Sequence, residues 1–177
     1  TNGVLLRTLT YPTFTMMNSA SLATGAFPGT TGFYGNTFWA PGAMGKDSGL
    51  NTVDFNQPVF TEDYAVLQDL DNFYNGQLLL VGTLFKAAQT AGKKTATVGK
   101  TGAAFLQDIK KGGFIIDERM AYPLQFAQDL QAANYALPKL TPNAYNPGQI
   151  TLAANNGDPT AALPKKLLAD NSTSDAS

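Results

Sequence analysis

The sequence contains neither cysteine nor histidine. Without cysteine, the chain can form no disulfide, no thiolate metal site and no cysteine nucleophile. Without histidine, it can form no Ser-His-Asp triad and no histidine-ligated metal site from its own residues. Any metal ion held by these residues would therefore be bound by oxygen ligands, or by ligands that come from elsewhere.

Charge and long hydrophobic runs are also scarce. Charged residues make up 14% of the chain, and the net charge is −1. Lys and Arg do not cluster beyond three lysine pairs, which argues against a surface for a nucleic-acid duplex or an acidic membrane. The longest apolar run, LLLVGTLF at 78–85, is far shorter than the roughly 18 residues of a membrane span. We therefore predict neither a duplex partner nor a membrane span.

Hydrophobic periodicity predicts helices that alternate with short strands. We expect strands at 4–10, 95–100 and 113–117, helices at 16–24, 78–94 and 122–135, and a loop excursion at about 40–62. This alternation is typical of an α/β protein with a mainly parallel sheet. The length suits one domain, which we assign to 1–136, followed by a Pro- and Asn-rich extension at 137–177 whose end is expected to be disordered.

In the first predicted helix, four residues are available to a buried side: Met17, Ala20, Leu22 and Ala23. Gly25 is expected to end this helix, because glycine readily adopts the left-handed conformation found just after a helix.

The stretch 13–36 contains no charged side chain, although it is rich in Thr, Ser, Asn and Gly. Thr15 stands where the first predicted strand gives way to the first predicted helix, and ligands of open α/β sheets bind at such strand ends. Thr15 is therefore either the N-cap of the helix or a nucleophile facing a phosphate at the helix N-terminus. Asn18 has a plain interpretation too, as a polar side chain that satisfies a turn of backbone.

Two weaker signals are interpreted as structural. Gly99-Lys100-Thr101 lacks the glycine of a phosphate-binding P-loop, because Lys94 stands at the required position. Four acidic residues, which do not have the spacing of a calcium loop, are expected to form a solvated face: Glu62, Asp63, Asp69 and Asp71.

The aromatic residues Phe33, Tyr34, Phe38 and Trp39 follow closely on one another. They are predicted to pack in the core and its loops, and the alternative is that some of them line a pocket for a leaving group.

The motif T-x-x-N at 15–18, with L-A-T-G at 22–25, then Pro28, Gly32 and Asn36, resembles the nucleotide pyrophosphatase/phosphodiesterase family of the alkaline phosphatase superfamily. The resemblance covers about the first 120 residues and is strongest at 11–36. It departs from the family pattern at Met16, Met17, Ser19 and Thr31, which concern the branch and its substrate more than the chemistry. The implied fold is an alkaline-phosphatase-like three-layer sandwich with a mainly parallel sheet, present here in part.

The resemblance also implies roles for individual residues. Thr15 matches the nucleophile, which also binds one metal ion, and Asn36 matches the residue that binds a non-bridging phosphoryl oxygen. Asn18 matches a motif residue with a positional role. The implied reaction is hydrolysis of a phosphodiester or pyrophosphate bond in a small phosphorylated substrate, through a phosphothreonine intermediate and with two divalent metal ions, zinc by analogy.

The Asp and His metal ligands of the family have no counterpart here, since residues 1–14 hold no acidic residue and the chain holds no histidine. We therefore expect the chain, which begins with Thr, to be a fragment that is inactive alone. The remaining ligands would come from a missing segment or a second polypeptide. The alternatives are a phosphomonoesterase or mutase of the same superfamily, and a non-catalytic extracytoplasmic binding or structural module. The resemblance implies a periplasmic or secreted protein and leaves the substrate open.

Overall fold

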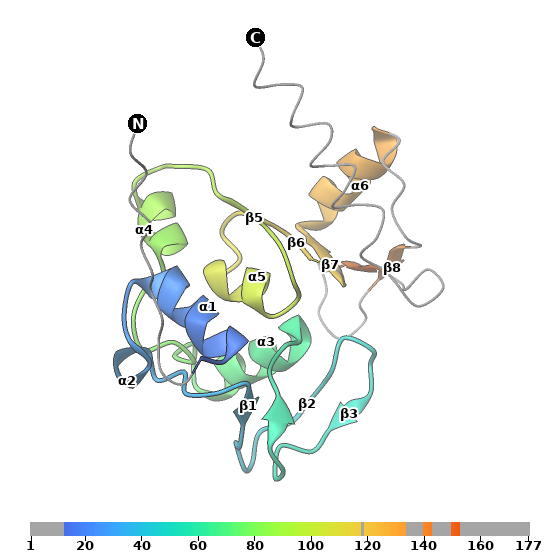
Figure 1. Cartoon of the computed structure of the whole chain (residues 1–177). Helices are drawn as coiled ribbons and strands as arrows, with labels where there is room; N and C mark the ends of the chain where they lie inside the picture. The colour runs from blue at the N-terminus through green and yellow to red at the C-terminus, as the bar shows by residue number, and fades with distance from the viewer. Residues whose placement is uncertain (1–12, 118, 134–139, 143–149, 153–177) are drawn as a thin grey trace.

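The computed structural model of the 177-residue chain describes residues 13–117, 119–133, 140–142 and 150–152 (Figure 1). The strand predicted at 4–10 and most of the extension at 137–177 lie outside these residues. In the described part of the chain, the helices are α1 (Thr15–Thr24), α2 (Pro28–Thr31), α3 (Tyr64–Phe73), α4 (Leu84–Thr90), α5 (Ala103–Gln107) and α6 (Leu124–Ala132). The strands are β1 (Thr37–Phe38), β2 (Gly45–Lys46), β3 (Thr52–Val53), β4 (Val59–Phe60), β5 (Ala96–Val98), β6 (Phe114–Ile116), β7 (Met120–Tyr122), β8 (Leu140–Pro142) and β9 (Ile150–Leu152).

Helix α1 forms where the sequence predicted a helix. Its buried residues are Met16, Met17, Ala20 and Ala23, which share one face. Leu22, which was predicted to be buried, lies off this face and is 76% exposed. Gly25 ends the helix as predicted, with φ of 70° and its N–H bonded to the Ser21 carbonyl.

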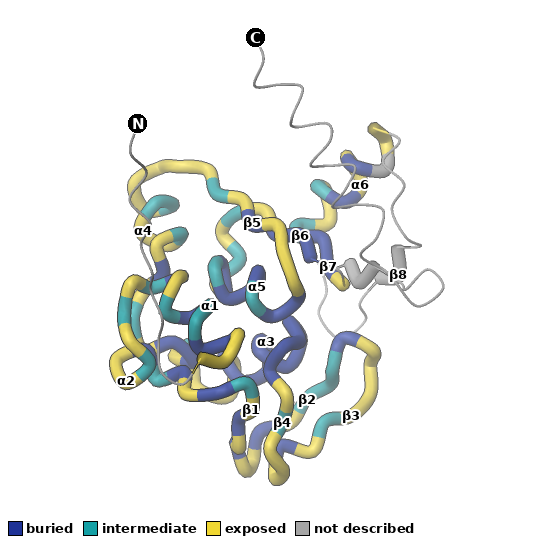
Figure 2. The backbone as a smooth tube through the Cα atoms, viewed as in Figure 1, coloured by how far each residue is buried: buried dark blue, intermediate teal, exposed yellow. Residues whose placement is uncertain are grey.

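Helix α3 lies in the middle of the core and is buried on almost all sides (Figure 2). Its N-cap is Asp63, whose carboxylate accepts hydrogen bonds from the Ala65 and Val66 N–H groups. Helix α1 packs against α5, which in turn packs against β5 and β6, so α1, α3 and α5 form one group beside the sheet (Figure 1).

The largest sheet has the strand order β5-β6-β7-β9-β8 and is mixed. In the described residues β5 and β6 are parallel, whereas the three other neighbouring pairs are antiparallel. The prediction of a mainly parallel sheet is wrong for this part of the chain, because β6 turns back directly into β7 instead of crossing over through a helix. The described residues do not establish the expected three-layer sandwich either.

Both faces of this sheet are nonetheless covered at its centre. Ile115 and Ile116 are adjacent on β6 and are 0% and 2% exposed, although neighbouring residues of a strand point to opposite faces. With α5 against β5 and β6, and α6 against β7, the architecture is α/β.

The predicted loop excursion at 40–62 contains the short strands β2, β3 and β4. β1 pairs with β4, with Thr37 opposite Phe60, and β2 pairs with β3. The first pairing places Asn36 beside Thr61 and thereby positions the candidate site.

Helix α4 is shorter than the predicted helix at 78–94. It begins after Thr83, whose hydroxyl oxygen accepts a 3.1 Å hydrogen bond from the Lys86 N–H. Leu78 and Leu79 precede it and fill the core from an irregular segment. None of the helices in the described ranges is both long enough and apolar enough to cross a membrane.

Candidate active site

Thr15 is the first residue of α1 and is exposed to solvent. The preceding residue, Phe14, is the N-cap and provides no side-chain hydrogen bond to the helix. The interpretation of Thr15 as an N-cap is therefore wrong. Backbone N–H groups in the first turn of a helix lack intrahelical partners and favour a nearby anion. The alternative, that Thr15 is a nucleophile facing a phosphate at this helix start, stays a prediction.

The Asn36 side chain lies at the same helix start. Its Oδ1 accepts a hydrogen bond from the Met16 N–H at 2.9 Å, so it performs the capping that Phe14 does not. Thr61 holds the Asn36 carbonyl through its own N–H, at 2.8 Å, and its hydroxyl, at 2.9 Å. Thr15 and Asn36, which are distant in sequence, are therefore brought together at the beginning of α1.

Asn18 lies one turn further along α1. Its Nδ2 donates a hydrogen bond of 2.9 Å to the Phe14 carbonyl. This contact agrees with the interpretation that Asn18 satisfies a turn of backbone, and a role toward substrate remains a prediction.

An ion pair that the sequence did not predict adjoins Asn36. The Asn36 Nδ2 is 3.4 Å from Glu62 Oε1, and the other carboxylate oxygen of Glu62 is paired with the Lys100 ammonium. The Glu62 side chain is 6% exposed and that of Lys100 is 56% exposed. Lys100 is 38 residues from Glu62 in sequence, so no local pattern could have indicated the pair.

The loop that carries Lys100 is held against Glu62 by a glycine. Gly102 has φ of +74°, and a Cβ on it would lie 2.8 Å from Glu62 Cα and 3.0 Å from the Thr61 carbonyl oxygen. Only glycine fits this close approach without displacement. Gly99-Lys100-Thr101 is not a P-loop. With Gly102, it places Lys100 next to Glu62.

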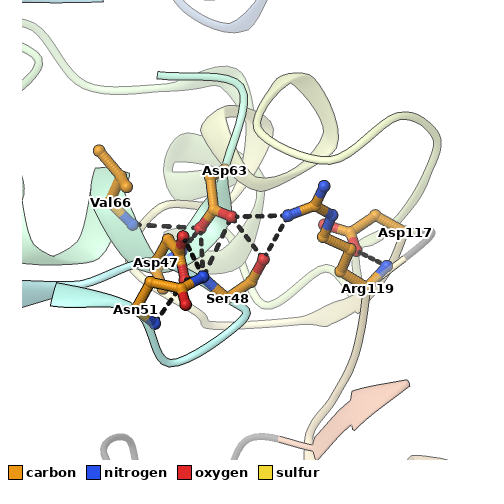
Figure 3. Close-up of polar contacts among 8 residues, drawn as sticks. Asp47, Ser48, Asn51, Asp63, Val66, Asp117 and Arg119 are labelled. Atoms are coloured by element: carbon orange, nitrogen blue, oxygen red, sulfur yellow. Dashed lines mark hydrogen bonds and ion pairs between the residues drawn. The ribbon is translucent and has the colours of Figure 1, made fainter. Parts of the chain in front are cut away.

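The interpretation of four acidic residues as a solvated face is wrong, because all of them are buried: Glu62, Asp63, Asp69 and Asp71. Figure 3 shows Asp63, Ser48 and Arg119 in contact with one another. Its carboxylate accepts from the Ser48 N–H at 3.1 Å and also binds the Ser48 hydroxyl, and Arg119 Nη1 lies 3.1 Å from its Oδ2. Asp71 is paired with Lys110 at 2.7 Å. Backbone amides and cations thus compensate these buried charges.

The aromatic run divides into core and surface. Phe33 and Phe38 are buried, as predicted for core packing, whereas Tyr34 and Trp39 are exposed. Tyr34 stacks on Phe38 with ring centroids 4.3 Å apart. Trp39 donates its indole N–H to the Asn56 carbonyl at 3.0 Å. The alternative that some of these rings line a leaving-group pocket stays a prediction.

The described residues do not by themselves fit a pair of metal ions. Within them, no group of three or more Asp, Glu, His or Cys side chains could hold a cation. The Glu62 carboxylate is already occupied by Asn36 and Lys100. Binding of a metal ion by Thr15 stays a prediction.

Two residues other than Thr15 and Asn36, Tyr74 and Lys111, have shifted pKa values. Burial raises the pKa of Tyr74, and the nearby Tyr34 adds to this increase. Burial lowers the pKa of Lys111, and Asp71 opposes that effect.

The fold and this cluster define an α/β protein that presents a threonine hydroxyl and an asparagine amide at one helix start. Residues 1–156 match the family model described as type I phosphodiesterase / nucleotide pyrophosphatase. Since this match covers well over half of the sequence, the chain belongs to that family, and the resemblance seen in the sequence is confirmed. Searches of curated proteins and of solved structures gave no significant match.

Membership places the chain in a family of hydrolases with an α/β fold of the alkaline phosphatase type. The family hydrolyses phosphodiester and pyrophosphate bonds and generally uses divalent metal ions. A small phosphorylated substrate fits this chemistry.

Proposed function

We propose that the protein hydrolyses phosphodiester or pyrophosphate bonds through a covalent intermediate on Thr15. The observation that carries this proposal is the position of an exposed Thr15 at the first turn of α1, next to the Asn36 amide that caps the same turn. Phosphoryl transfer through a covalent intermediate uses a nucleophile that attacks phosphorus and hydrogen-bond donors for the charge that develops on the non-bridging oxygens.

The proposed reaction has two steps. The Thr15 oxygen forms a bond to phosphorus as the bond to the leaving oxygen breaks, the leaving oxygen takes the electron pair, and the hydroxyl proton passes to solvent. Water then attacks the phosphothreonine, the bond between phosphorus and the Thr15 oxygen breaks, and the hydroxyl is restored. The second Nδ2 hydrogen of Asn36 would bind the charge that develops on a non-bridging oxygen.

The divalent ions of the proposed enzyme, zinc by analogy, need ligands beyond the described residues. We propose that a missing segment or a second polypeptide supplies the Asp and His ligands, and that Thr15 completes the site. By the same resemblance, we propose a periplasmic or secreted location.

The test is Thr15→Ala in the full protein, assayed on bis-p-nitrophenyl phosphate with added zinc. We expect turnover to be abolished and the free energy of unfolding to be unchanged within about 0.5 kcal/mol, because Thr15 is exposed. Thr15→Ser, the control, keeps the hydroxyl and should keep measurable turnover. Acid quenching with a ³²P-labelled substrate should trap label on the wild type and not on Thr15→Ala.

Turnover that survives in Thr15→Ala would remove Thr15 as the nucleophile. A wild-type protein with its full complement of zinc and no turnover on diesters or monoesters would favour the non-catalytic binding module.

A further inference from the structure

The orientation of the Asn36 amide is set by two opposite neighbours. On one side the Met16 N–H requires an acceptor and receives Oδ1 at 2.9 Å. On the other side the Glu62 carboxylate requires a donor, and Nδ2 lies 3.4 Å from its Oε1. An amide turned over by 180° would set oxygen against oxygen and N–H against N–H. The buried carboxylate therefore favours the orientation that keeps the NH₂ group available to a ligand.

Glu62 is itself held in place from three directions. Its side chain is 6% exposed and is paired with Lys100. Its main chain lies close to Gly102. A Cβ on Gly102 would be 2.8 Å from Glu62 Cα, so the close approach depends on glycine. The preceding residue, Thr61, binds the Asn36 carbonyl. Glu62 and Asn36 are thus joined through both main chain and side chain, so a shift of Glu62 moves the amide.

Lys100 offsets the unfavourable free energy of burying the Glu62 carboxylate at this position. A bare anion next to a site for a phosphoryl group would repel the substrate, and a buried carboxylate without a partner would be costly. The Lys100 ammonium neutralises Glu62 while its side chain remains 56% exposed. The net charge that Glu62 and Lys100 together present to a substrate is therefore zero.

We propose that Glu62, neutralised by Lys100, is the positioning residue that orients the Asn36 amide toward the phosphoryl group. This inference rests on the proposed function, since Asn36 would be the residue that binds the phosphoryl oxygen. Glu62 does not touch the substrate, and its effect on turnover passes through Asn36.

The experiment is a double-mutant cycle in the full protein with zinc, on bis-p-nitrophenyl phosphate. Glu62→Ala should lower kcat about tenfold, with KM changed by less than about threefold, because a misdirected donor affects the transition state most. In an Asn36→Ala background the same substitution should cost less than about twofold, because its effect passes through the amide. Glu62→Gln keeps an acceptor oxygen and should recover most of the loss.

Asp71→Ala is the matched control. It also removes a buried carboxylate paired with a lysine, but near the opposite end of α3. It should lower the melting temperature and leave kcat unchanged. An equal loss from Glu62→Ala in both backgrounds, an equal loss of kcat in Asp71→Ala, or wild-type kcat in Glu62→Ala would each overturn the proposal.

Thr15→Ala, measured in parallel, separates this proposal from the one on which it rests. Turnover that persists in Thr15→Ala would overturn the phosphothreonine, whereas orientation by Glu62 is judged independently from the ¹H–¹⁵N signals of the Asn36 side-chain amide. Those signals should shift in Glu62→Ala and stay in place in Asp71→Ala. Unchanged signals in Glu62→Ala would overturn the positioning role.

Discussion

At the scale of the residue, Asn36 does two things with one amide. Its oxygen caps α1 through the Met16 N–H, and its nitrogen faces Glu62. In the proposed function the same nitrogen also binds a phosphoryl oxygen, so a substitution of Asn36 is judged by both stability and turnover.

Asn36→Ala should lower kcat by about 10²–10³, which is the cost of removing one hydrogen-bond donor from a developing oxyanion. It should also lower the free energy of unfolding by about 1 kcal/mol, because the Met16 N–H loses its acceptor. The measurements are steady-state kinetics and urea unfolding.

Thr83→Ala serves as the matched control, because it removes a comparable cap from α4. It should lose about the same stability with no change in kcat. A similar decrease in kcat in both variants would mean that Asn36 matters for the fold alone.

At the scale of the element, the sequence predicted what local spacing encodes. Met17, Ala20 and Ala23 on the buried face of α1, and its end at Gly25, follow from residues a few positions apart, as do β5 and β6. The same spacing wrongly placed Leu22 on this face and missed Met16. Thr15 and Asn36 could be singled out because they belong to one motif. Their proximity in space also depends on the β1–β4 pairing, which two-residue strands do not reveal in sequence.

Helix α3 was not predicted, although its sequence alternates apolar and polar residues with a helical period. Its polar residues Gln68, Asp69 and Asp71 are buried along with the apolar ones. Its acidic residues look like surface residues in the sequence, because the partners that compensate them are remote, as Lys110 is for Asp71. Glu62 was misread for the same reason, since Lys100 comes from another loop.

The loop 99–102 allows a prediction at this scale. Gly102→Ala should lower the free energy of unfolding by about 1–3 kcal/mol, because its φ of +74° and the 2.8 Å approach to Glu62 Cα both disfavour a side chain. Turnover should also decrease, because Glu62 would be displaced. Urea unfolding and kcat measure the two effects.

Gly99→Ala is the control from the same loop. A Cβ there would meet Ala104 at an ordinary 3.6 Å, so the stability should change by no more than about 0.5 kcal/mol. Equal effects at the two positions would show that the close approach at Gly102 is not what matters.

At the scale of the whole molecule, the described residues contain no group of three or more Asp, Glu, His or Cys side chains that could hold a metal ion. Material with the 18.7 kDa mass of these 177 residues should therefore bind fewer than two zinc ions and show no hydrolysis of bis-p-nitrophenyl phosphate. Longer or two-chain material that carries the missing ligands should bind two ions, lose activity on chelation and regain it with zinc. Intact mass spectrometry gives the length of the material, and a zinc assay on the same preparation gives the number of bound ions. Two ions on the 18.7 kDa chain would contradict the prediction.

The contact between Met16 and Asn36 closes a loop of chain that spans 20 positions. Because the Asn36 side chain is held by groups of the protein itself, its rotational freedom is lost during folding. In the proposed function, a phosphorylated ligand at α1 would therefore meet an Asn36 side chain whose position is already set, and most of the entropic penalty of binding would fall on the ligand.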